Sequence, residues 1–444
     1  MKMYDLIAKK RDGGALAEAE IAFWLGGCLS GEVPDYQTAA MLMAIYFRGM
    51  TEREIFALTE QIVLSGDRLE LSAVSGVKAD KHSTGGVGDK TTLIAIPLAA
   101  AAGLKIAKMS GRSLGKTGGT ADKLAAIPGF CLDMPDEKLY QQVNDIGLAL
   151  ITQTRNLTPA DKLLYALRDM TATVDSLPLI AASVMSKKLA AGAQVIVLDV
   201  KYGSGAFMPD AESAQKLAEL MVKIGRYNGR KVSAVISAMD SPLGETVGNA
   251  LEVVESAEVL QGGGAPDLRR LSLLLAGEML LLGGIAESRE DGYRRAEQEL
   301  TSGRGWQKFL QMVAAQGGDA APLLDGSLMQ AKYVLKIGAP EGGYVTRLDA
   351  AEAAALVQRL GAGRSRVEDE IDLDVGIRFL KRPGDAVAAG ETLAVVYAND
   401  VTLGAAVGRD LLQVVHIGPE PPQTEPLVYG IVYGREFIGG DMLP

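Results

Sequence analysis

The residues best suited to chemistry lie in one glycine-rich stretch, residues 81–92, with the sequence Lys-His-Ser-Thr-Gly-Gly-Val-Gly-Asp-Lys-Thr-Thr. Glycines let backbone N–H groups approach an anion closely, and Lys81, Ser83 and Thr92 add side-chain donors, so the expected ligand is phosphate. His82 lies beside this predicted anion site. It is one of only 2 histidines in the chain, so chemistry that needs an imidazole near neutral pH has few candidates.

A second glycine-rich loop, residues 110–120, follows a predicted strand over residues 104–109. Ligands of parallel α/β sheets bind beyond the carboxyl ends of the strands, so we expect both loops to face one cleft. Neither loop is a Walker phosphate loop, because Asp89 interrupts the first and Ser110 replaces the leading glycine of the second. Neither turn carries a G-x-G-x-x-G motif, so the pattern disfavours both an NTPase and a dinucleotide site.

Basic residues gather around these loops in a chain that is acidic as a whole. They are Lys81, Lys90, Lys105, Lys108, Arg112, Lys116 and Lys123. A solvated basic surface explains this gathering, but the interleaved glycine, serine and threonine residues favour an anion site.

A third set of polar residues follows helical spacing. Tyr165 and Arg168 share one face of the helix predicted after Thr158-Pro159, and Ser183 and Lys187 share one face of the next helix. An aromatic ring, a guanidinium, a hydroxyl and an ammonium so arranged can hold a flat, carbonyl-rich heterocycle. A solvated helix face explains the same spacing, and the spacing alone favours that simpler interpretation.

The elements that must position these groups change character along the chain. Residues 1–66 show the three- and four-residue spacing of packed helices, with Asp35 as a predicted cap and Thr51 to Glu54 as a capping box. This bundle is more apolar than a small domain requires, which favours a dimer interface over simple packing within the chain. After Gly76, apolar strands alternate with turns and helices, the pattern of a largely parallel sheet.

Three later segments complete the expected architecture. Residues 93–104 are predicted to be a buried strand and turn, and residues 195–200 a central strand buried on both faces. From about residue 332 the chain is β-rich around one helix, and His416 is expected to be structural. The turn at 383–391 resembles that of a biotinyl or lipoyl carrier but has no lysine at its tip, so no covalently attached organic cofactor is expected.

Length and charge limit the classes of partner. A chain of 444 residues predicts two or three domains that need no disulfide framework. Its formal net charge of −10 disfavours nucleic acid and favours a small ligand. The N-terminus lacks an apolar signal region, and the longest apolar run is shorter than the ~20 residues of a membrane span. We therefore expect a cytoplasmic protein with no membrane partner.

Several of these motifs together make the chain similar to the pyrimidine-nucleoside phosphorylases, the relatives of thymidine phosphorylase. The segments that carry the resemblance are 81–92, 110–122, 165–168 and 183–187, with further agreement at 3–13, 175–180 and 205–208. The resemblance covers essentially the whole chain. Long motifs in the right order are more specific than any one of them.

The resemblance implies a fold of the α/β plus α class, in which a small all-helical domain faces a larger α/β domain across a hinged cleft. The helical domain is expected over residues 1–66, joined by helices from about 158–192. The α/β phosphate-binding domain is expected over 76–157 and 193–330, and a C-terminal α+β subdomain over 332–444. A homodimer through the N-terminal helices is also expected.

The resemblance also assigns residues to sites. The phosphate set is Lys81, Ser83, Thr92, Lys108, Ser110 and Thr120. The nucleoside set is Tyr165, Arg168, Ser183 and Lys187, and the catalytic set is His82, Arg168 and Lys187. Some members bind potassium, largely through backbone oxygens, and the matching positions are Gly88, Lys90, Leu243, Thr246 and Glu255.

The implied activity is reversible phosphorolysis of uridine, thymidine and deoxyuridine to the free base and an α-(deoxy)ribose 1-phosphate. Cleavage leaves negative charge on the pyrimidine and positive charge on the sugar, which Arg168 and Lys187 on one side and phosphate on the other stabilise. Phosphate then attacks as co-substrate. His82 is placed to donate a proton or hydrogen bond to the base, a step worth ~10²–10⁴ in rate.

Three positions depart from the family pattern, since Ser113, Lys116 and Ala125 replace a glycine, a histidine and a glutamate. The missing histidine belongs to a loop associated with domain closure. Lys116 can reach a carbonyl near Gly205 or contact the anion directly. Two alternatives stay open: a nucleoside or phosphate sensor without turnover, and a phosphoribosyltransferase-like enzyme, which the nucleoside-binding set disfavours.

Overall fold

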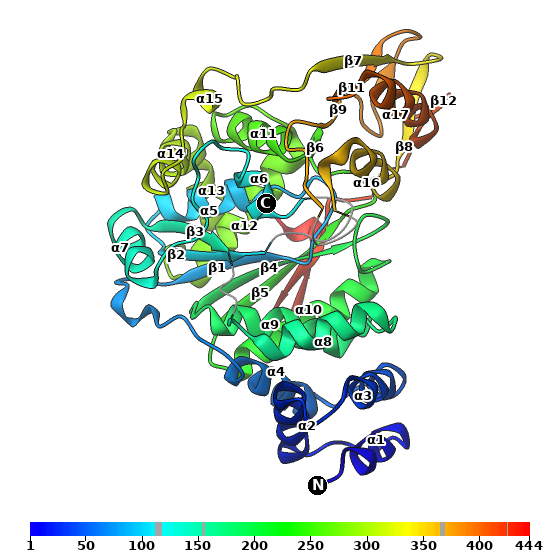
Figure 1. Cartoon of the computed structure of the whole chain (residues 1–444). Helices are drawn as coiled ribbons and strands as arrows, with labels where there is room; N and C mark the ends of the chain where they lie inside the picture. Colours follow the sequence, from blue (N-terminus) through cyan, green and yellow to red (C-terminus); the bar gives the residue numbers. More distant parts are fainter. Residues whose placement is uncertain (112–117, 153–155, 365–368, 424) are drawn as a thin grey trace.

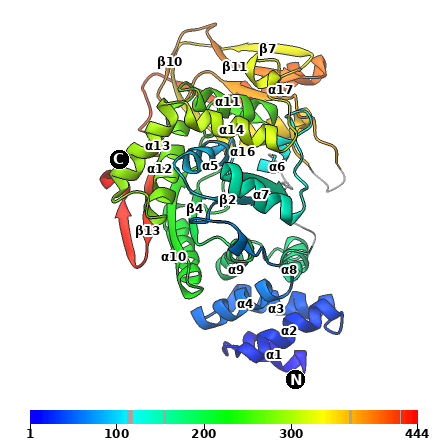
Figure 2. The same ribbon diagram turned by 90° about the vertical axis from the view of Figure 1, so that its left-hand side faces the viewer.

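The computed structural model describes residues 1–111, 118–152, 156–364, 369–423 and 425–444 (Figure 1). The N-terminal helices lie at one end of the molecule, the sheets of the α/β domain in the middle, and a smaller group of strands and helices at the other end (Figures 1 and 2). The fold class predicted from the sequence is confirmed.

The helical domain combines four N-terminal helices with two from later in the chain. These are α1 (Met3–Arg11), α2 (Glu18–Ser30), α3 (Asp35–Arg48), α4 (Glu52–Leu64), α8 (Pro159–Met170) and α9 (Leu177–Ala190). Trp24 and Leu58 are fully buried and share one core with Leu164 of α8 and Leu179 of α9. Helices α8 and α9 therefore lie between the N-terminal helices and the sheet (Figure 2).

Helix α9 has apolar side chains on both sides, since Leu179 and Ala182 pack in the helical domain while Met185 and Leu189 pack against strand residues of the sheet. A helix that is apolar on more than one face is buried between two layers. This helix is the element that joins the two domains.

The helix-start predictions have mixed outcomes. The capping box is confirmed: Thr51 Oγ1 accepts from Glu54 N at 3.3 Å, and Thr51 N donates to Glu54 Oε2 at 2.8 Å. The Asp35 cap is wrong, because Asp35 is the first helical residue and Pro34 precedes it as the N-cap without a side-chain bond. Thr158 lies at the N-cap of α8, but its hydroxyl makes no cap bond.

The central sheet has the order β1-β4-β5-β13-β14. Its strands are β1 (Ala79–Ser83), β4 (Val195–Tyr202), β5 (Lys231–Ala238), β13 (Val428–Tyr433) and β14 (Glu436–Gly439). The first three are parallel, whereas β13 is antiparallel to β5, and β14 to β13. The predicted strand at 195–200 is the buried strand β4.

Alternate side chains of β4 pack on opposite faces of the sheet. Val195 and Val197 belong to one hydrophobic core, whereas Ile196 and Leu198 belong to another, which includes residues of α9 and of α10 (Ala211–Tyr227). The helices concerned are α5 (Thr91–Ala101), α10 (Ala211–Tyr227), α11 (Ala250–Leu260), α12 (Pro266–Leu282), α13 (Arg289–Thr301) and α14 (Arg304–Ala315). The sheet thus has helices on both faces, as parallel sheets require.

Residues 93–104 form most of helix α5, so the prediction of a strand here is wrong. Every residue from Thr91 to Ala100 is buried, including Pro97 inside the helix. A continuous apolar run carries no periodicity that separates a buried helix from a buried strand, and its length favours the helix.

Two further strands extend the sheet layer beyond β1. These are β2 (Ile106–Ser110) and β3 (Leu148–Thr152), which pair in parallel, with α7 (Asp136–Ile146) between them in the sequence. A parallel bridge between Lys78 and Lys105 sets β2 beside β1. The strand predicted at 104–109 is therefore present.

The C-terminal region contains two small sheets. Their strands and helices are β7 (Tyr333–Gly338), β8 (Gly343–Leu348), α16 (Ala350–Val357), β9 (Gly376–Phe379), β10 (Ala386–Val387), β11 (Thr392–Ala398), α17 (Val401–Val414) and β12 (Val415–Gly418). Strand β6 (Thr246–Gly248) of the α/β domain pairs with β9. Strand β13 pairs with β5 of the central sheet and β14 pairs with β13, so a division at residue 332 does not describe residues 428–439.

None of the helices in the described part of the chain has the length and apolar character needed to cross a bilayer.

The buried pair Lys10–Glu54 generates a first prediction. Glu54 Oε1 accepts from Lys10 Nζ at 2.7 Å and from Leu16 N at 2.8 Å, and both charged side chains are at most 4% exposed. Glu54→Ala leaves the Lys10 ammonium buried without its partner, so we expect a loss of about 3–5 kcal/mol of unfolding free energy, measured by urea denaturation.

Glu52→Ala in the same helix is the control. Glu52 pairs with Lys223 at 2.8 Å, but the two side chains are 58% and 44% exposed, so the expected loss is about 1 kcal/mol or less. Equal losses in the two variants would contradict the assignment of Lys10–Glu54 as a structural pair.

Candidate active site

Two loops leave neighbouring parallel strands at the same edge of the sheet. Strand β1 ends at Ser83 and β2 ends at Ser110. The Lys108 ammonium on β2 donates to Lys81 O on β1 at 2.6 Å, across a separation of 27 residues. The same offset separates Ser83 from Ser110, so the structure brings both halves of the predicted phosphate set to this edge.

Lys81 connects β1 to the first turn of α5. Its Nζ lies 2.6 Å from Thr91 Oγ1 and 3.3 Å from Thr92 Oγ1, and it is 3.6 Å from Asp199 Oδ2. The N-terminus of a helix favours an anion because its N–H groups are unpaired there and its dipole is positive. Lys81, Thr92 and the start of α5 thus form a cationic, donor-rich corner.

The other predicted phosphate residues lie around this corner with partial exposure. Ser83 Oγ accepts from Gly85 N at 3.1 Å, which closes the turn after β1. Ser110 is half-buried at the end of β2, and Thr120 is half-buried as the first residue of the short helix α6 (Thr120–Leu124). All three residues are therefore partly exposed at this edge.

Asp80 neutralises two buried lysines on the opposite face of β1. Its Oδ1 lies 3.1 Å from Lys108 Nζ and its Oδ2 lies 2.9 Å from Lys188 Nζ. Burial lowers the pKa of Lys108 to about 7, with Asp80 opposing and the neighbouring Lys188 and Lys81 ammonium groups reinforcing the shift. Lys108 therefore changes charge near neutral pH.

Asp199 has the same role on the other face of the strands. Lys201 Nζ lies 2.9 Å from Asp199 Oδ2 and 4.0 Å from Asp89 Oδ2. Burial opposes ionisation of Asp89, but Lys201, Lys81 and Lys123 outweigh it and lower the pKa of Asp89 well below its usual value. Asp89 Oδ1 accepts from Thr91 Oγ1 at 2.6 Å, which orders the loop before α5.

His82 is partly buried among ammonium groups. Burial is the largest cause that lowers the pKa of its imidazole well below the usual value, followed by the charges of Lys188, Lys108, Lys81 and Lys187. The imidazole is therefore neutral at pH 7. In that state it can donate one N–H hydrogen bond and accept another.

Arg168 is held by the chain between α8 and α9. Its Nε donates to Thr173 O at 3.3 Å, its Nη1 to Leu179 O at 3.1 Å and its Nη2 to Val174 O at 2.5 Å. The guanidinium also lies 5.7 Å from the ring centroid of Tyr165. These bonds use three of its five N–H groups, so within the described residues it retains donors for a ligand.

Lys187 is held by two helices. Its Nζ pairs with Asp161 of α8 and donates to Ser183 Oγ at 3.0 Å and Ser183 O at 3.2 Å. The Lys187 side chain is 24% exposed, whereas Asp161 is buried. The structure therefore brings the buried Ser183 and the partly exposed Lys187 together on α9, with Arg168 on α8.

Adjacent lysines of α9 connect the two halves of the site. Lys188 pairs with Asp80 of β1, while Lys187 pairs with Asp161 of α8. Neighbouring residues of a helix point about 100° apart, so one can reach the sheet and the next the helical domain. The charge of Lys187 acts on His82, which places the predicted nucleoside and phosphate sets in one electrostatic environment.

The predicted closure pair is described only in part. Gly205 N donates to Met239 O at 3.0 Å, and a Cβ at Gly205 would come within 2.6 Å of Ala350 Cβ. Any larger residue would therefore push against the start of α16. Ser113 and Lys116 lie outside the described residues.

The five residues matched to potassium also converge, but the Lys90 ammonium lies at their centre. Lys90 Nζ lies 3.0 Å from Leu243 O, 3.0 Å from Thr246 O and 2.5 Å from Glu255 Oε2. A Cβ at Gly88 would meet the same two carbonyls at 2.7 and 2.9 Å. The Lys90 ammonium therefore occupies the space between the oxygen atoms of residues that the resemblance assigns to potassium.

Sequence reasoning missed the carboxylates and the second lysine that hold the site. Asp161 orients Lys187, and Asp80 holds Lys108 together with Lys188. Asp80 and Lys188 had a detectable signal, since a charged residue inside a buried strand or helix needs a partner of opposite sign. Asp161 resembled an ordinary first-turn acid and had no such signal.

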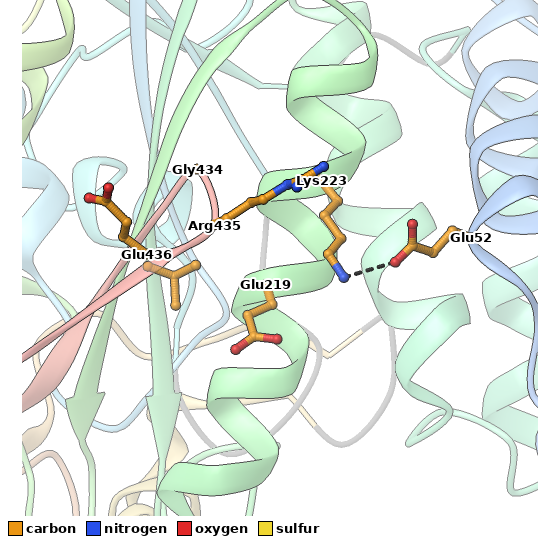
Figure 3. A pocket seen from close by; sticks show the side chains of 7 residues that line it. Glu52, Glu219, Lys223, Gly434, Arg435 and Glu436 are labelled. Carbon is orange, nitrogen blue, oxygen red and sulfur yellow. Dashed lines mark hydrogen bonds and ion pairs between the residues drawn. The ribbon is translucent and has the colours of Figure 1, made fainter.

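A cavity of about 370 Å³ lies elsewhere, between α4, α10 and the β13–β14 hairpin (Figure 3). Its lining includes Glu52, Lys223 and Arg435, and the ion pair between Lys223 and Glu52 spans it from α10 to α4. Tyr433 pairs with Ser233 near the start of β5. The cavity is thus at the amino end of the parallel strands, opposite the edge that carries Ser83.

The chain resembles known proteins along nearly its whole length. Residues 75–306 match the glycosyl transferase family α/β domain, residues 4–66 the helical bundle domain of that family, and residues 344–417 the pyrimidine nucleoside phosphorylase C-terminal domain. The pyrimidine-nucleoside phosphorylase of Geobacillus stearothermophilus is 49% identical over 97% of this chain and 99% of its own. That of Bacillus subtilis is 49% identical over 92% and 95%.

A solved structure agrees with the fold. The anthranilate phosphoribosyltransferase of Thermus thermophilus superposes with a TM-score of 0.57 at 22% identity, covering 70% of this chain and 98% of its own. At this identity the likeness concerns the fold alone.

The pKa of Lys108 generates a prediction on anion binding. Sulfate does not titrate between pH 6 and 9, so changes in its affinity report the protein. An anion at this edge favours protonated Lys108, whose pKa is about 7 without ligand. We expect sulfate affinity, measured by calorimetry, to weaken by up to about tenfold per pH unit above pH 7.

Lys108→Met should bind sulfate more weakly at pH 6.5 and lose most of this pH dependence. Lys216→Met changes an exposed lysine of α10 and should leave both quantities unchanged. An unaltered pH dependence in Lys108→Met would contradict the role of Lys108 in anion binding.

Proposed function

This chain belongs to the pyrimidine-nucleoside phosphorylases of the glycosyl transferase family, and from that membership we propose how its residues perform the reaction. The enzyme transfers the pentosyl group of a pyrimidine nucleoside to phosphate, which gives the free base and an α-pentose 1-phosphate. The observation that carries the proposal is the adjacent pair Lys187 and Lys188, which connects the nucleoside-binding helices to the phosphate-binding edge of the sheet.

Phosphate binds at the carboxyl ends of β1 and β2 in this proposal. Lys81 and Thr92 face it from β1 and the start of α5, and Lys108, Ser110 and Ser83 face it from the strand ends. Thr120 approaches from the start of α6. The support is the excess of ammonium groups over carboxylates at this edge, which suits a dianion.

The base binds against α8 and α9. Pyrimidines present carbonyl oxygens in one plane, and the guanidinium of Arg168 and the ammonium of Lys187 supply donors for them. Tyr165 is 39% exposed beside Arg168 and offers an aromatic face. Ser183 adds a hydroxyl that already contacts Lys187 Nζ at 3.0 Å.

The chemistry follows from where charge develops. As the N-glycosidic bond breaks, the base gains negative charge and the sugar gains positive charge. Arg168 and Lys187 stabilise the first, and phosphate stabilises the second before its oxygen bonds to C1′. Both cations are present in fixed positions before the reaction starts, so little reorganisation is needed in the transition state.

His82 acts as a neutral hydrogen-bond donor to a base carbonyl in this proposal. Burial and the surrounding ammonium groups lower its pKa, so an imidazolium is not the resting form. A bound phosphate dianion offsets those charges and raises the proton affinity of the imidazole. His82 therefore becomes a better proton carrier only when the nucleophile is in place.

Uridine, thymidine and deoxyuridine are the proposed substrates, in reactions that serve nucleoside salvage in the cytoplasm. A phosphoribosyltransferase with this fold is the second candidate. It is disfavoured because the two base-facing cations and the hydroxyl of α8 and α9 match a pyrimidine, and because relatives at 49% identity bear the phosphorylase name.

The first experiment incubates the protein with uridine, thymidine, deoxyuridine or cytidine, with and without phosphate, and quantifies free base and pentose 1-phosphate by chromatography. We expect base release from the first three only with phosphate, in equal amounts with pentose 1-phosphate. Release without phosphate would indicate a hydrolase. Ligand binding without release would indicate a sensor.

The two histidines allow a matched comparison in the same assay. His82→Ala should lower kcat by ~10²–10⁴ and leave sulfate affinity nearly unchanged, because the imidazole it removes is neutral. His416→Ala, at an exposed position on β12, should keep full activity. Weaker sulfate binding with unchanged kcat in His82→Ala would reassign His82 to the anion.

We also propose that the enzyme is a homodimer through its N-terminal helices. Tyr4 of α1 and Tyr36 and Phe47 of α3 are more than 70% exposed, and covering such side chains favours association. Light scattering after size exclusion should give a dimer for the unmodified chain and a monomer for Phe47→Glu. Leu324→Glu, at an exposed position of α15 (Ala321–Leu324), should stay dimeric, and a monomeric parent chain would contradict the proposal.

A further inference from the structure

Lys90 is the N-cap residue of α5, at the end of the loop that carries His82. Its side chain is 0% exposed and turns away from solvent. The ammonium has three partners, Leu243 O, Thr246 O and Glu255 Oε2, at 3.0, 3.0 and 2.5 Å. An ammonium has three N–H donors, so this oxygen shell satisfies it completely.

The shell is itself tightly ordered. Glu255 Oε1 accepts from Glu245 N at 2.7 Å, and Glu255 Oε2 accepts from Thr246 N at 2.9 Å and Thr246 Oγ1 at 2.6 Å. Burial opposes ionisation of Glu255, but Lys90 and these hydrogen bonds outweigh it and lower the pKa of the carboxyl. The Glu255 carboxylate therefore balances the charge of the Lys90 ammonium in a site with no solvent exposure.

Backbone carbonyls with one carboxylate are the ligands that a potassium ion uses when it leaves water. The positions match those expected for potassium, yet the ion does not fit beside the ammonium. A Cβ at Gly244 would lie 2.8 Å from Lys90 Nζ and 2.5 Å from Glu255 Oε1, so the shell has no spare volume there. A second positive charge at such a distance would also be strongly repelled.

The shell joins three parts of the molecule. Lys90 precedes Thr91 and Thr92, which contact Lys81. Its partner residues 243–246 lead into β6, which pairs with β9 of the C-terminal region, and Glu255 lies on α11. A cation here fixes the start of α5, and thus the proposed phosphate site, to both neighbours.

We propose that Lys90 is a built-in replacement for a monovalent cation, so that its tethered ammonium holds the start of α5 permanently and the enzyme needs no alkali metal ion. A covalently attached ammonium cannot dissociate from its site. The contacts of Lys90 with Leu243, Thr246 and Glu255 are therefore independent of the salt in solution. The activity readout rests on the proposed function, whereas the stability readout does not.

The experiment measures the melting temperature and kcat in choline chloride, with choline replaced stepwise by KCl or NaCl at constant ionic strength. The unmodified enzyme should give the same values in all three salts. Lys90→Thr removes the ammonium and opens the oxygen shell, so it should melt lower in choline and recover progressively with KCl, as one-site binding predicts. Lys90→Leu fills the space without charge and should stay low in every salt.

Lys123→Thr is the matched control, because Lys123 is also a buried lysine with a carboxylate partner, Glu252 Oε2 at 2.6 Å, and a carbonyl partner, Asp89 O at 2.6 Å. It should lose stability equally in choline and in potassium. Potassium-specific stabilisation or activation of the unmodified enzyme would overturn the proposal. Failure of KCl to raise the melting temperature of Lys90→Thr, or equal rescue of Lys123→Thr, would do the same.

If Lys90→Thr does not fold, the potassium titration of the unmodified enzyme decides the question alone. If the unmodified enzyme shows no phosphorolysis in any salt while the melting temperatures follow the expected pattern, the proposed function is contradicted but the role of Lys90 is not. The two failures are therefore distinguishable.

Discussion

The structure depends on burying more ammonium groups than carboxylates at one edge of a parallel sheet. Lys81, Lys108, Lys188 and Lys201 are at most 3% exposed there, and Asp80, Asp89 and Asp199 are their nearby counter-charges. Isolated buried charges are too unfavourable to persist, so Asp80 and Asp199 each serve two lysines. The excess positive charge favours the binding of an anion. The same buried lysines therefore form ion pairs that the fold requires and contribute to the proposed phosphate site.

The same arrangement sets the state of the imidazole. His82 and Asp80 alternate with Lys81 along β1, so the histidine faces the side of the strand where Lys108 and Lys188 converge. An imidazole surrounded by these ammonium groups stays neutral, and in the proposed mechanism a bound phosphate dianion offsets their charges. In that mechanism the proton affinity of His82 depends on whether phosphate is bound, because both groups interact with the same buried lysines.

Residue types and spacing were sufficient to predict the N-terminal helices and the buried strands at 104–109 and 195–200, whereas the fold class was implied by the family resemblance. Residue types and spacing did not predict features that depend on the direction in which a side chain points. Residues 93–104 carry no periodicity because every side of α5 is buried. The inward direction of the Lys90 side chain likewise has no signal in the sequence. Asp161 and Lys188 act through partners far away in the sequence, which spacing within one helix does not reveal.

The hairpin formed by β13 and β14 is needed to complete the central sheet, so the sheet cannot be completed before this hairpin has been synthesised. Strands β13 and β14 come last in sequence among the described strands, yet β13 pairs with β5, nearly two hundred residues earlier, and β14 pairs with β13. The edge of β5 therefore stays unpaired until residues 428–433 have been synthesised, and an unpaired strand edge is a template for wrong pairing. Such long-range closure slows folding. Removal of residues 428–444 would therefore leave every residue of the proposed active site in place and still expose the unpaired edge of β5, so the solubility of the protein depends on a segment that contributes nothing to its chemistry.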